Sequence, residues 1–461
     1  MKTVIGLEIH VQLKTKSKMF CRCDNNAENA APNTLVCPIC MGMPGTLPVA
    51  NKKAIEWTLK TSLALNCQIA EFSRFDRKHY FYPDLPKGYQ ISQYDKPFAT
   101  NGFLEIDVAG EFKKIGIRRV HLEEDAGKLI HRGNATLVDL NRAGTPLMEV
   151  VSEPEINSPQ EAKIFMQELR SILRYLDVSD ADMEKGHLRC DANISIEVDG
   201  KEGVPIEIKN MNSFRMVERA LSYEEKRQRE LLEKGEKIAK ETRGWIDAKG
   251  ITVSQRGKEY AQDYRYFPEP DLPSYRPHRA FNIARLQKEL PELPALKRSK
   301  YIEMGLPIQD AAIISIDNEM AAYFEKVTEK ISPRLAANWI INELKSEGIL
   351  DIAPENLISL LDKIGKGEIS GKIAKEIFAE MISSGKKPDE IIAEKGIKQI
   401  GAKDELTNII DEVIKENEKT VADYQQGKKE ALGFLVGKVM QKTSGQANPQ
   451  VANKILIEKL K

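Results

Sequence analysis

Acidic and imidazole side chains alternate with apolar ones along several stretches of this 461-residue chain. In residues 4–13, Glu8 and His10 point to one side of an extended backbone, while isoleucine, leucine and valine point to the other. Residues 115–123 and 188–198 repeat the pattern. Carboxylates and imidazoles at two-residue spacing can bind a hard cation such as Mg²⁺. The ordinary alternative is the solvent-exposed face of an antiparallel sheet.

Basic side chains accompany these acids. Arg189 and Asp191 fall on one face of residues 188–198, and Lys209 ends a similar alternating stretch. Cations beside a metal-binding surface can hold phosphate oxygens, so the pattern favours a surface that binds ATP and stabilises phosphoryl transfer. The segment at Ser370 resembles a Walker A loop but lacks its leading glycine and its final Ser or Thr. We therefore expect any ATP site to lie on a sheet.

Four of the six cysteines form two close pairs near the N-terminus. These are Cys21 with Cys23 and Cys37 with Cys40. The spacing predicts a structural Zn²⁺ site, in which four thiolates surround the ion and leave no coordination position open for catalysis. The alternative is four reduced thiols.

Residues 75–94 combine aromatic rings, basic side chains and two prolines. Pro83 and Pro86 fix backbone angles and remove hydrogen-bond donors, so the rings cannot all belong to one strand ladder. Rings and cations on a stiffened loop suit stacking on a base and pairing with phosphate. The composition equally supports a surface loop that packs on itself.

The elements that would position these residues can be read from periodicity. Alternation predicts strands at 4–13, 115–123, 188–198 and 204–209. Ser158 and Glu161 flank a proline in a capping-box pattern, which predicts the start of a helix with an apolar face. Ser332 followed by Pro333 predicts another helix start. Helices with apolar faces beside strands indicate an α+β fold.

The chain divides by composition. Prolines between Phe267 and Pro277 predict a stiff boundary, after which the chain is helical and rich in Lys and Glu. A second break is expected near residues 396–402. In the segment beyond it, Gly433 and Gly437 leave one helix face without side chains, which favours close helix packing.

Charge and hydropathy restrict the possible functions. Lys plus Arg (69) equals Asp plus Glu (69), so a nucleic-acid contact must be a local patch. Residues 413–461 contain nine lysines and five acidic residues, which is a modest positive excess. No segment is apolar enough to span a bilayer or to act as a signal peptide, and the cysteine usage fits a reducing compartment. We expect a cytoplasmic protein with no membrane contact.

Several motifs are long enough to indicate a family. In the N-terminal part they are GLEIH at 6–10, DRKHYFYPDLPKGYQ at 76–90, HLEEDAGK at 121–128 and DLNRAGTP at 139–146. Farther along they are LRCDANIS at 188–195, KNMNSF at 209–214, DYRYFPEPD at 263–271, KEALGFLVG at 429–437 and GQANP at 445–449. Together they resemble the GatB family, the B subunits of aspartyl/glutamyl-tRNA(Asn/Gln) amidotransferases, from residue 3 to the end of the chain.

The resemblance implies a particular α+β architecture. An N-terminal antiparallel-sheet cradle domain, similar to glutamine synthetase, is followed by all-α helical and YqeY-like tail domains. We expect the cradle at residues 1–290 with the zinc loop at 21–40, the helical domain at 291–400 and the tRNA-binding tail at 401–461.

The resemblance also implies an ATP-dependent ligase that acts on misacylated tRNA. The side-chain carboxylate of Glu on tRNA(Gln), or of Asp on tRNA(Asn), is phosphorylated, and ammonia then displaces phosphate to give Gln-tRNA(Gln) or Asn-tRNA(Asn). By the family pattern, the expected catalytic and Mg²⁺-binding residues are Glu8, His10, Glu123 and Glu149. Those expected to bind the nucleotide are Arg189, Asp191 and Lys209, and Asp191 is also a weaker candidate for the metal cluster.

The chain contains no Ser-Ser-Lys amidase pattern and no Cys-His-Glu glutaminase pattern. The resemblance therefore implies that ammonia comes from a partner amidase, the family's A subunit, in a heterotrimer whose third member is the small C subunit. Two other interpretations stay open. The chain can be a non-catalytic tRNA-binding scaffold of the same complex, or a stand-alone ligase on free amino acids that resembles glutamine synthetase.

Overall fold

The structure is a computed structural model that describes residues 1–108, 110–257, 264–344, 352–395, 403–428, 430–443, 447 and 449–460. The chain forms two compact units, Met1–Leu296 and Lys297–Lys461. The break expected at 396–402 lies outside the described residues. Within the described part of the chain, no helix has both the length and the apolarity that crossing a membrane requires.

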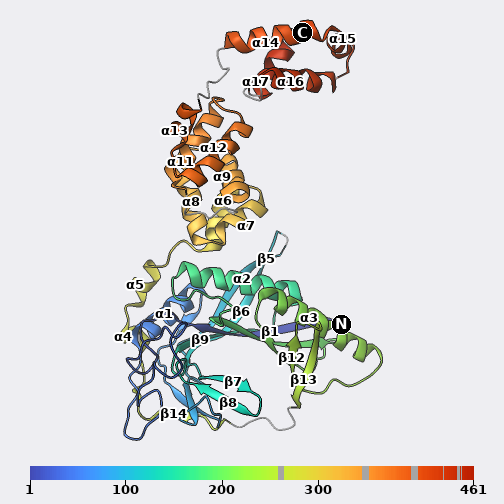
Figure 1. Ribbon diagram of the computed structural model, residues 1–461. Coiled ribbons are helices and arrows are strands. Elements are labelled where there is room, and N and C mark those ends of the chain that lie inside the picture. Colours follow the sequence, from blue (N-terminus) through green and yellow to red (C-terminus); the bar gives the residue numbers. More distant parts are fainter. Residues whose placement is uncertain are drawn as a thin grey trace. The chain divides into compact units, whose positions relative to one another are not determined.

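A nine-stranded sheet is the centre of the first unit (Figure 1). Its strand order is β13-β12-β11-β10-β1-β9-β6-β5-β2, so the first strand of the chain lies in the middle. The strands are β1 (Lys2–Gln12), β2 (Gln68–Ile69), β5 (Ala99–Val108), β6 (Glu111–Glu124), β9 (Pro146–Ser152), β10 (Leu188–Glu197), β11 (Ile206–Met211), β12 (Glu241–Ile246) and β13 (Ile251–Gly257). The strands predicted from alternation correspond to β1, β6, β10 and β11 and are confirmed.

The described sheet is antiparallel except at one pair of neighbouring strands, which is parallel. Residues 207–209 of β11 pair in parallel with residues 242–244 of β12. The helix α3 (Phe214–Glu233) lies in the connection between these two strands. A connection that contains a helix can return the chain to the same end of the sheet, which makes the next strand parallel.

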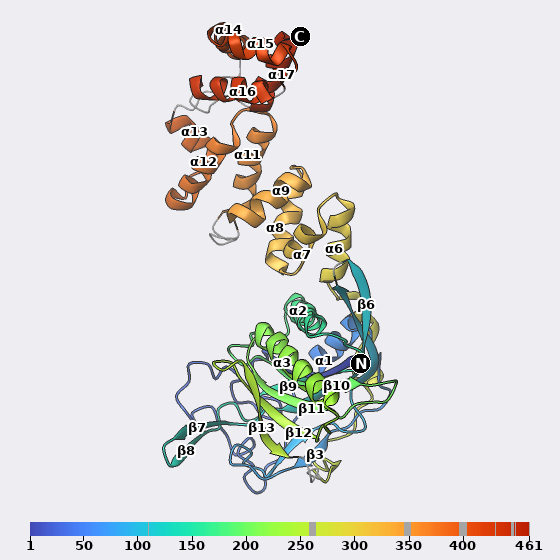
Figure 2. The same cartoon turned by 90° about the vertical axis from the view of Figure 1, so that its right-hand side faces the viewer.

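Three helices cover one face of the sheet, as Figures 1 and 2 show: α1 (Lys52–Ala64), α2 (Pro159–Tyr175) and α3. The apolar sides of these helices and of the strands form one core, in which Ile9 and Phe165 are fully buried. Because successive strand residues point to opposite faces, the residues that flank Ile9 belong to the other face of the sheet.

The helix α2 begins where the sequence predicted. The Ser158 hydroxyl accepts a hydrogen bond from the backbone N–H of Glu161 at 3.1 Å. The Glu161 carboxylate accepts from the N–H of Asn157 at 2.9 Å, one residue before the position that a capping box uses. Half of the predicted capping box is therefore present.

The proline-rich run that was expected to end the first domain lies inside the first unit. Its strand β14 (Phe267–Pro268) pairs with β3 (Asp76–His79), which pairs in turn with β4 (Tyr89–Ser92). The run therefore does not end the first unit, which continues to Leu296, and its Pro268 lies on an edge strand, where a missing donor costs no ladder bond. The unit also contains a hairpin of β7 (Lys128–Arg132) and β8 (Ala135–Asp139), and the short helices α4 (Pro277–Ala280) and α5 (Ile283–Lys288).

The described part of the second unit is helical. Its first helices are α6 (Pro294–Glu303), α7 (Ile308–Ser315), α8 (Asn318–Thr328), α9 (Pro333–Trp339), η1 (Ile340–Leu344), α11 (Pro354–Gly365), α12 (Gly371–Ser384) and α13 (Pro388–Glu394). The helix predicted to begin after Ser332 is confirmed as α9, which continues into a π-helical turn, and Ala337 and Leu344 are buried as expected. The Ser332 side chain makes no capping hydrogen bond.

The C-terminal helices have a core of their own. They are α14 (Lys403–Glu416), α15 (Glu418–Gln425), α16 (Glu430–Lys442) and α17 (Pro449–Leu460). The apolar face of α16 lies in this core, where Leu435 and Val439 are fully buried. The close packing expected at Gly433 and Gly437 is not found among the described residues, because a Cβ at either glycine would meet no atom within 4 Å.

Candidate active site on the polar face of the sheet

Three adjacent strands bring histidine and glutamate side chains into one row across the sheet. His10 of β1 is directly opposite Glu149 of β9, and Glu149 is directly opposite His121 of β6. Directly opposed residues in an antiparallel pair point to the same face. The row continues to Arg189 of β10, which is opposite His10. The face away from the core therefore carries a cluster of ionisable groups.

The centre of this cluster has the composition of a divalent-cation site. One ligand atom each from His10, Glu123 and Glu149 lie within 4.8 Å of one another. The Nε2 atom of His10 is 3.2 Å from Glu149 Oε2 and 3.8 Å from Glu123 Oε1. An imidazole nitrogen and two carboxylate oxygens fit Mg²⁺ or Mn²⁺, which retain water and phosphate oxygens as their other ligands.

Glu8 lies on the same face, beside this group of three. It is opposite Asp191 of β10, and its carboxylate accepts a hydrogen bond from the Asn193 amide at 3.1 Å. Burial, followed by the charges of Glu149 and Asp191, raises the pKa of Glu8. A bound cation would relieve this crowding of carboxylates.

A second histidine, His121, connects the two buried carboxylates. Its Nε2 atom is 3.2 Å from Glu149 Oε2 and 3.8 Å from Glu123 Oε2. Burial lowers the pKa of His121, but the charges of Glu149 and Glu123 outweigh burial and raise it to about 9. His121 belonged to the alternating stretch at 115–123, so periodicity could have identified it.

The three residues expected to bind the nucleotide lie toward the β10 and β11 side of the face. Arg189 forms an ion pair with Asp125. Lys209 forms one ion pair with Asp191 and another, at 3.2 Å, with Glu207. The structure thus brings Asp191 and Lys209 together and gives Arg189 a different carboxylate partner.

Two basic residues that sequence reasoning did not select also face the cluster. Arg119 is two residues before His121 on β6, and its Nε atom is buried without a hydrogen-bond partner among the described residues. Lys78 comes from β3, and burial lowers its pKa while the negative charge of Glu123 raises it to a net value above the ordinary one. The pattern of 115–123 could have revealed Arg119, whereas Lys78 was one of the basic side chains of the 75–94 run, and no pattern placed it beside Glu123 because it belongs to another sheet.

The aromatic run at 75–94 is divided between two environments. Phe75 is in the core, and the Tyr89 ring lies under the Arg77 guanidinium at 4.4 Å. Phe81 and Tyr82 are exposed, at 88% and 58% of their surface. Phe75 thus belongs to the main core and Tyr89 packs on a neighbouring strand, so neither ring lies in a loop that packs on itself, and the recognition interpretation stays a prediction for the exposed rings.

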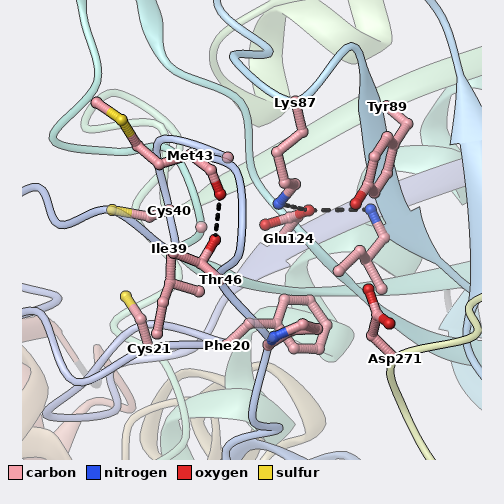
Figure 3. A pocket seen from close by; sticks show the side chains of 14 residues that line it. Phe20, Cys21, Ile39, Cys40, Met43, Thr46, Lys87, Tyr89, Glu124 and Asp271 are labelled. Carbon is pink, nitrogen blue, oxygen red and sulfur yellow. Dashed lines mark hydrogen bonds and ion pairs between the residues drawn. The ribbon is translucent and has the colours of Figure 1, made fainter.

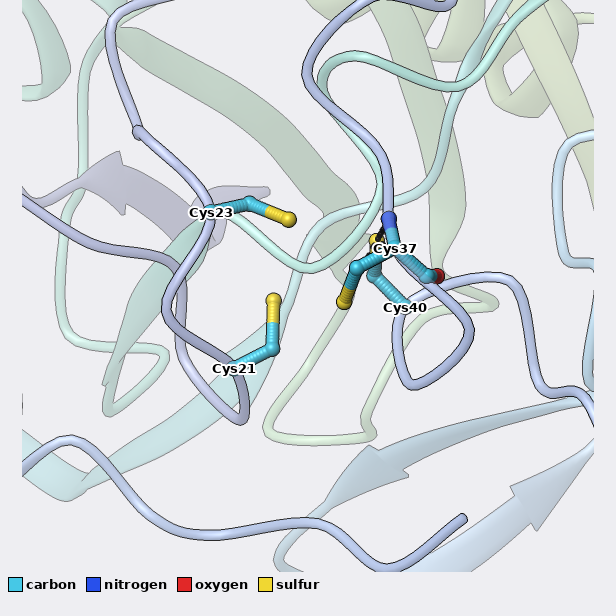
Figure 4. A group of neighbouring side chains, drawn as sticks. All are labelled: Cys21, Cys23, Cys37 and Cys40. Atoms are coloured by element: carbon cyan, nitrogen blue, oxygen red, sulfur yellow. Dashed lines mark hydrogen bonds between the residues drawn. The ribbon is translucent and has the colours of Figure 1, made fainter. Parts of the chain in front are cut away.

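The four cysteines converge at one place, as Figure 4 shows. Cys21 and Cys23 come from one segment and face Cys37 and Cys40 of another, and their sulfur atoms lie within 4.8 Å of one another. All four are free of disulfide bonds. Four thiolates at this spacing fit tetrahedral Zn²⁺.

A cavity of about 130 Å³ lies next to the cysteines (Figure 3). Cys21 and Cys40 contribute to one side of it, and the ion pair of Lys87 with Glu124 contributes to another. None of the three candidate metal ligands on the sheet lines this cavity. It is therefore separate from the histidine–glutamate cluster.

Comparison with known proteins identifies the class of protein. A family model described as the GatB/GatE catalytic domain matches residues 3–281, and one described as the GatB domain matches residues 322–460. The first match contains the whole sheet and the histidine–glutamate cluster, so the chain has a catalytic domain of the GatB/GatE class.

Full-length relatives define the family more narrowly. The B subunit of the aspartyl/glutamyl-tRNA(Asn/Gln) amidotransferase of Thermoanaerobacter pseudethanolicus is 52% identical, over 100% of this chain and 99% of the relative. The proteins of the same name from Carboxydothermus hydrogenoformans and Thermotoga maritima are 49% and 51% identical, over 100% and 99% of this chain and 98% of each relative. The chain belongs to this GatB family of aspartyl/glutamyl-tRNA amidotransferase subunits.

Proposed function

We propose that the polar face of the sheet is the active site of an ATP-dependent transamidation. The substrate is Glu-tRNA(Gln), Asp-tRNA(Asn) or both, and the products are Gln-tRNA(Gln) and Asn-tRNA(Asn). The observation that carries the proposal is the convergence of His10, Glu123 and Glu149 from three strands within 4.8 Å of one another. Membership of the GatB family supports the choice of substrate.

In the proposed reaction, the aminoacyl side-chain carboxylate attacks the γ-phosphorus of ATP, ADP leaves, and an acyl phosphate forms. Ammonia then attacks the carbonyl carbon, and phosphate leaves with the C–O bonding electrons. His10, Glu123 and Glu149 would hold Mg²⁺, with Glu8 beside them, and the ion offsets the negative charge of the phosphates.

The basic residues of the face would hold the phosphates of ATP. Arg119 has a buried Nε atom with no hydrogen-bond partner in the described part of the chain, and the ion pairs of Arg189 and Lys209 can exchange one carboxylate for a phosphate oxygen. Asp191 would keep Lys209 in place and would contribute to the metal cluster when a second ion binds. These groups are fixed on strands, so little reorganisation is needed during phosphoryl transfer.

The proposed assembly is a cytoplasmic heterotrimer in which this chain joins an amidase and a small third protein, the A and C subunits of the family. The amidase would supply ammonia from glutamine, and the C-terminal helices would bind the tRNA body. The four cysteines would hold a structural Zn²⁺.

The test is ATP cleavage by the reconstituted complex, driven by Glu-tRNA(Gln), with free ammonia as the nitrogen donor. Replacing Glu123→Gln or Glu149→Gln removes a charge but little volume, so we expect a loss of about 100-fold or more in turnover. Glu111→Gln changes an exposed glutamate of the same strand β6 and is the matched control. Undiminished turnover in both cluster variants would support the non-catalytic scaffold instead, and activity on free glutamate without tRNA would support a stand-alone ligase.

A further inference from the structure

Lys18 is a fully buried cation beside the four cysteines. It is 0% exposed, and its Nζ atom lies 3.9 Å from Cys40 Sγ and 3.4 Å from the carbonyl oxygen of Leu140. Among the described residues, no carboxylate oxygen forms an ion pair with it. Glu124 also approaches this place: its Oε1 atom is bound by Lys87 and by the N–H of Ile91, whereas its Oε2 atom points toward Gly144 but forms no ion pair with Lys18 among the described residues.

The backbone fixes Lys18 in this position. The Lys18 N–H donates to the Cys23 carbonyl at 3.0 Å, and the next residue donates to the Gly144 carbonyl at 2.6 Å. Gly144 has a φ angle of +86°, and a Cβ there would lie 3.5 Å from Lys18 Cδ and 3.6 Å from Cys40 Cβ. The side-chain stem of Lys18 is therefore enclosed between Gly144 and the cysteine cluster.

A buried ammonium group is costly unless it has a negative partner, and four neutral thiols provide none. A site that consists of one divalent ion and four thiolates carries two excess negative charges as a whole. The structure supplies one hydrogen bond to this charge from the Cys37 N–H, which donates to Cys40 Sγ at 3.1 Å. The buried cation thus favours the metal-bound thiolate state over four reduced thiols.

We propose that Lys18 is a positioning residue of the cysteine site, where its ammonium group neutralises thiolate charge at Cys40 and slows the release of Zn²⁺. The inference rests on the proposed zinc occupancy but is independent of the ATP chemistry.

The experiment compares zinc release from the full-length chain to a chromophoric chelator. Lys18→Met removes the charge and keeps the length of the side chain, whereas Lys16→Met changes an exposed lysine on the same segment and is the control. We expect Lys18→Met to release Zn²⁺ about 10-fold to 100-fold faster, in line with the loss of other outer-shell partners, and Lys16→Met to match the wild type. The thiolate-to-metal absorption bands of the Co²⁺-substituted protein should shift in Lys18→Met only.

Lys18→Arg separates charge from packing and remains informative if Lys18→Met fails to fold. Slow release in Lys18→Arg supports the proposal. Release that is equally fast in Lys18→Arg and Lys18→Met would assign the effect to packing and would overturn it. Wild-type release rates in Lys18→Met would also overturn it. A wild-type chain without metal would refute the zinc occupancy itself, and with it the role of Lys18, while leaving the transamidation proposal intact.

Discussion

His121 has two buried carboxylates, those of Glu123 and Glu149, near one ring nitrogen. Its Nε2 atom contacts Glu149 at 3.2 Å and Glu123 at 3.8 Å, and all three side chains are buried. A ring held between two candidate metal ligands restricts the rotamers of both. Such partners of metal ligands contribute to affinity without touching the ion.

We predict that His121→Gln raises the metal concentration needed for half-maximal ATP cleavage by about 10-fold to 100-fold. Glutamine can replace only one of the two contacts, so one carboxylate becomes free to move. Titration of Mg²⁺ in the tRNA-driven assay measures the effect, and His131→Gln, on the exposed β7–β8 hairpin, is the control. An unchanged metal titration in His121→Gln would show that the carboxylates do not need this ring.

At the residue scale, the sequence predicted which side chains share the polar face of a strand, but it did not predict which side chains of different strands are in contact. Alternation placed Glu8 and His10 on a polar face because a strand has a fixed period of two. The contact of His10 with Glu123 depends on strand order, which no local pattern contains. Lys78 reaches the cluster from a separate small sheet, so its role followed only from the tertiary structure.

At the element scale, the two serine–proline helix starts differ in a way that the sequence did not reveal. Ser158 accepts a hydrogen bond from the N–H of Glu161, whereas Ser332 makes no side-chain capping bond. Both serines precede a proline that is compatible with the first helical turn. The backbone angles of the two caps differ, with φ −149° and ψ 155° at Ser158 and φ −58° and ψ 137° at Ser332.

We predict that Ser158→Ala destabilises the first turn of α2 by about 1 kcal/mol, and that Ser332→Ala has almost no effect on α9. The first substitution leaves the N–H of Glu161 without its acceptor, and the second removes no hydrogen bond. Hydrogen exchange of the peptides that cover each helix start measures the two local free energies. Equal effects at both sites would contradict the capping assignment.

The sequence predicted the positions of the strands more reliably than it predicted which strands pair with each other. The alternating stretches correspond to β1, β6, β10 and β11, since one face of each is in the core. The parallel pairing of β11 with β12 depends on the helical connection through α3, and β14 is too short to produce a pattern. The prolines around β14 resembled a boundary because edge strands and linkers share their composition.

At the scale of the whole molecule, the C-terminal helices have a hydrophobic core that, among the described residues, is made of their own side chains. Leu406, Leu435 and Leu456 are buried within this cluster. The core beneath the nine-stranded sheet includes no described residue of these helices. Composition had already separated this segment by its lysine excess, although charge alone did not favour a tRNA-binding role.

We predict that removing residues 401–461 weakens binding of Glu-tRNA(Gln) to the complex by about tenfold or more, because basic contacts to phosphates are lost. Turnover at saturating tRNA should persist, since the proposed active site lies in the first unit. Filter binding over a range of salt concentrations measures affinity, and a shallower salt dependence is expected for the shortened chain. Equal affinity and equal salt dependence would exclude a tRNA-binding role for this segment.

The central place of β1 in the sheet has a consequence for synthesis on the ribosome. β1 is the first strand to be translated, yet its two neighbours, β9 and β10, end only at Ser152 and Glu197. The apolar side of β1 must therefore remain without its partners while more than a hundred further residues are made. The segment that contains β1 is thus without its neighbouring strands until β9 has been made, whereas all four cysteines are present once Cys40 has been translated and could bind a metal long before the sheet closes.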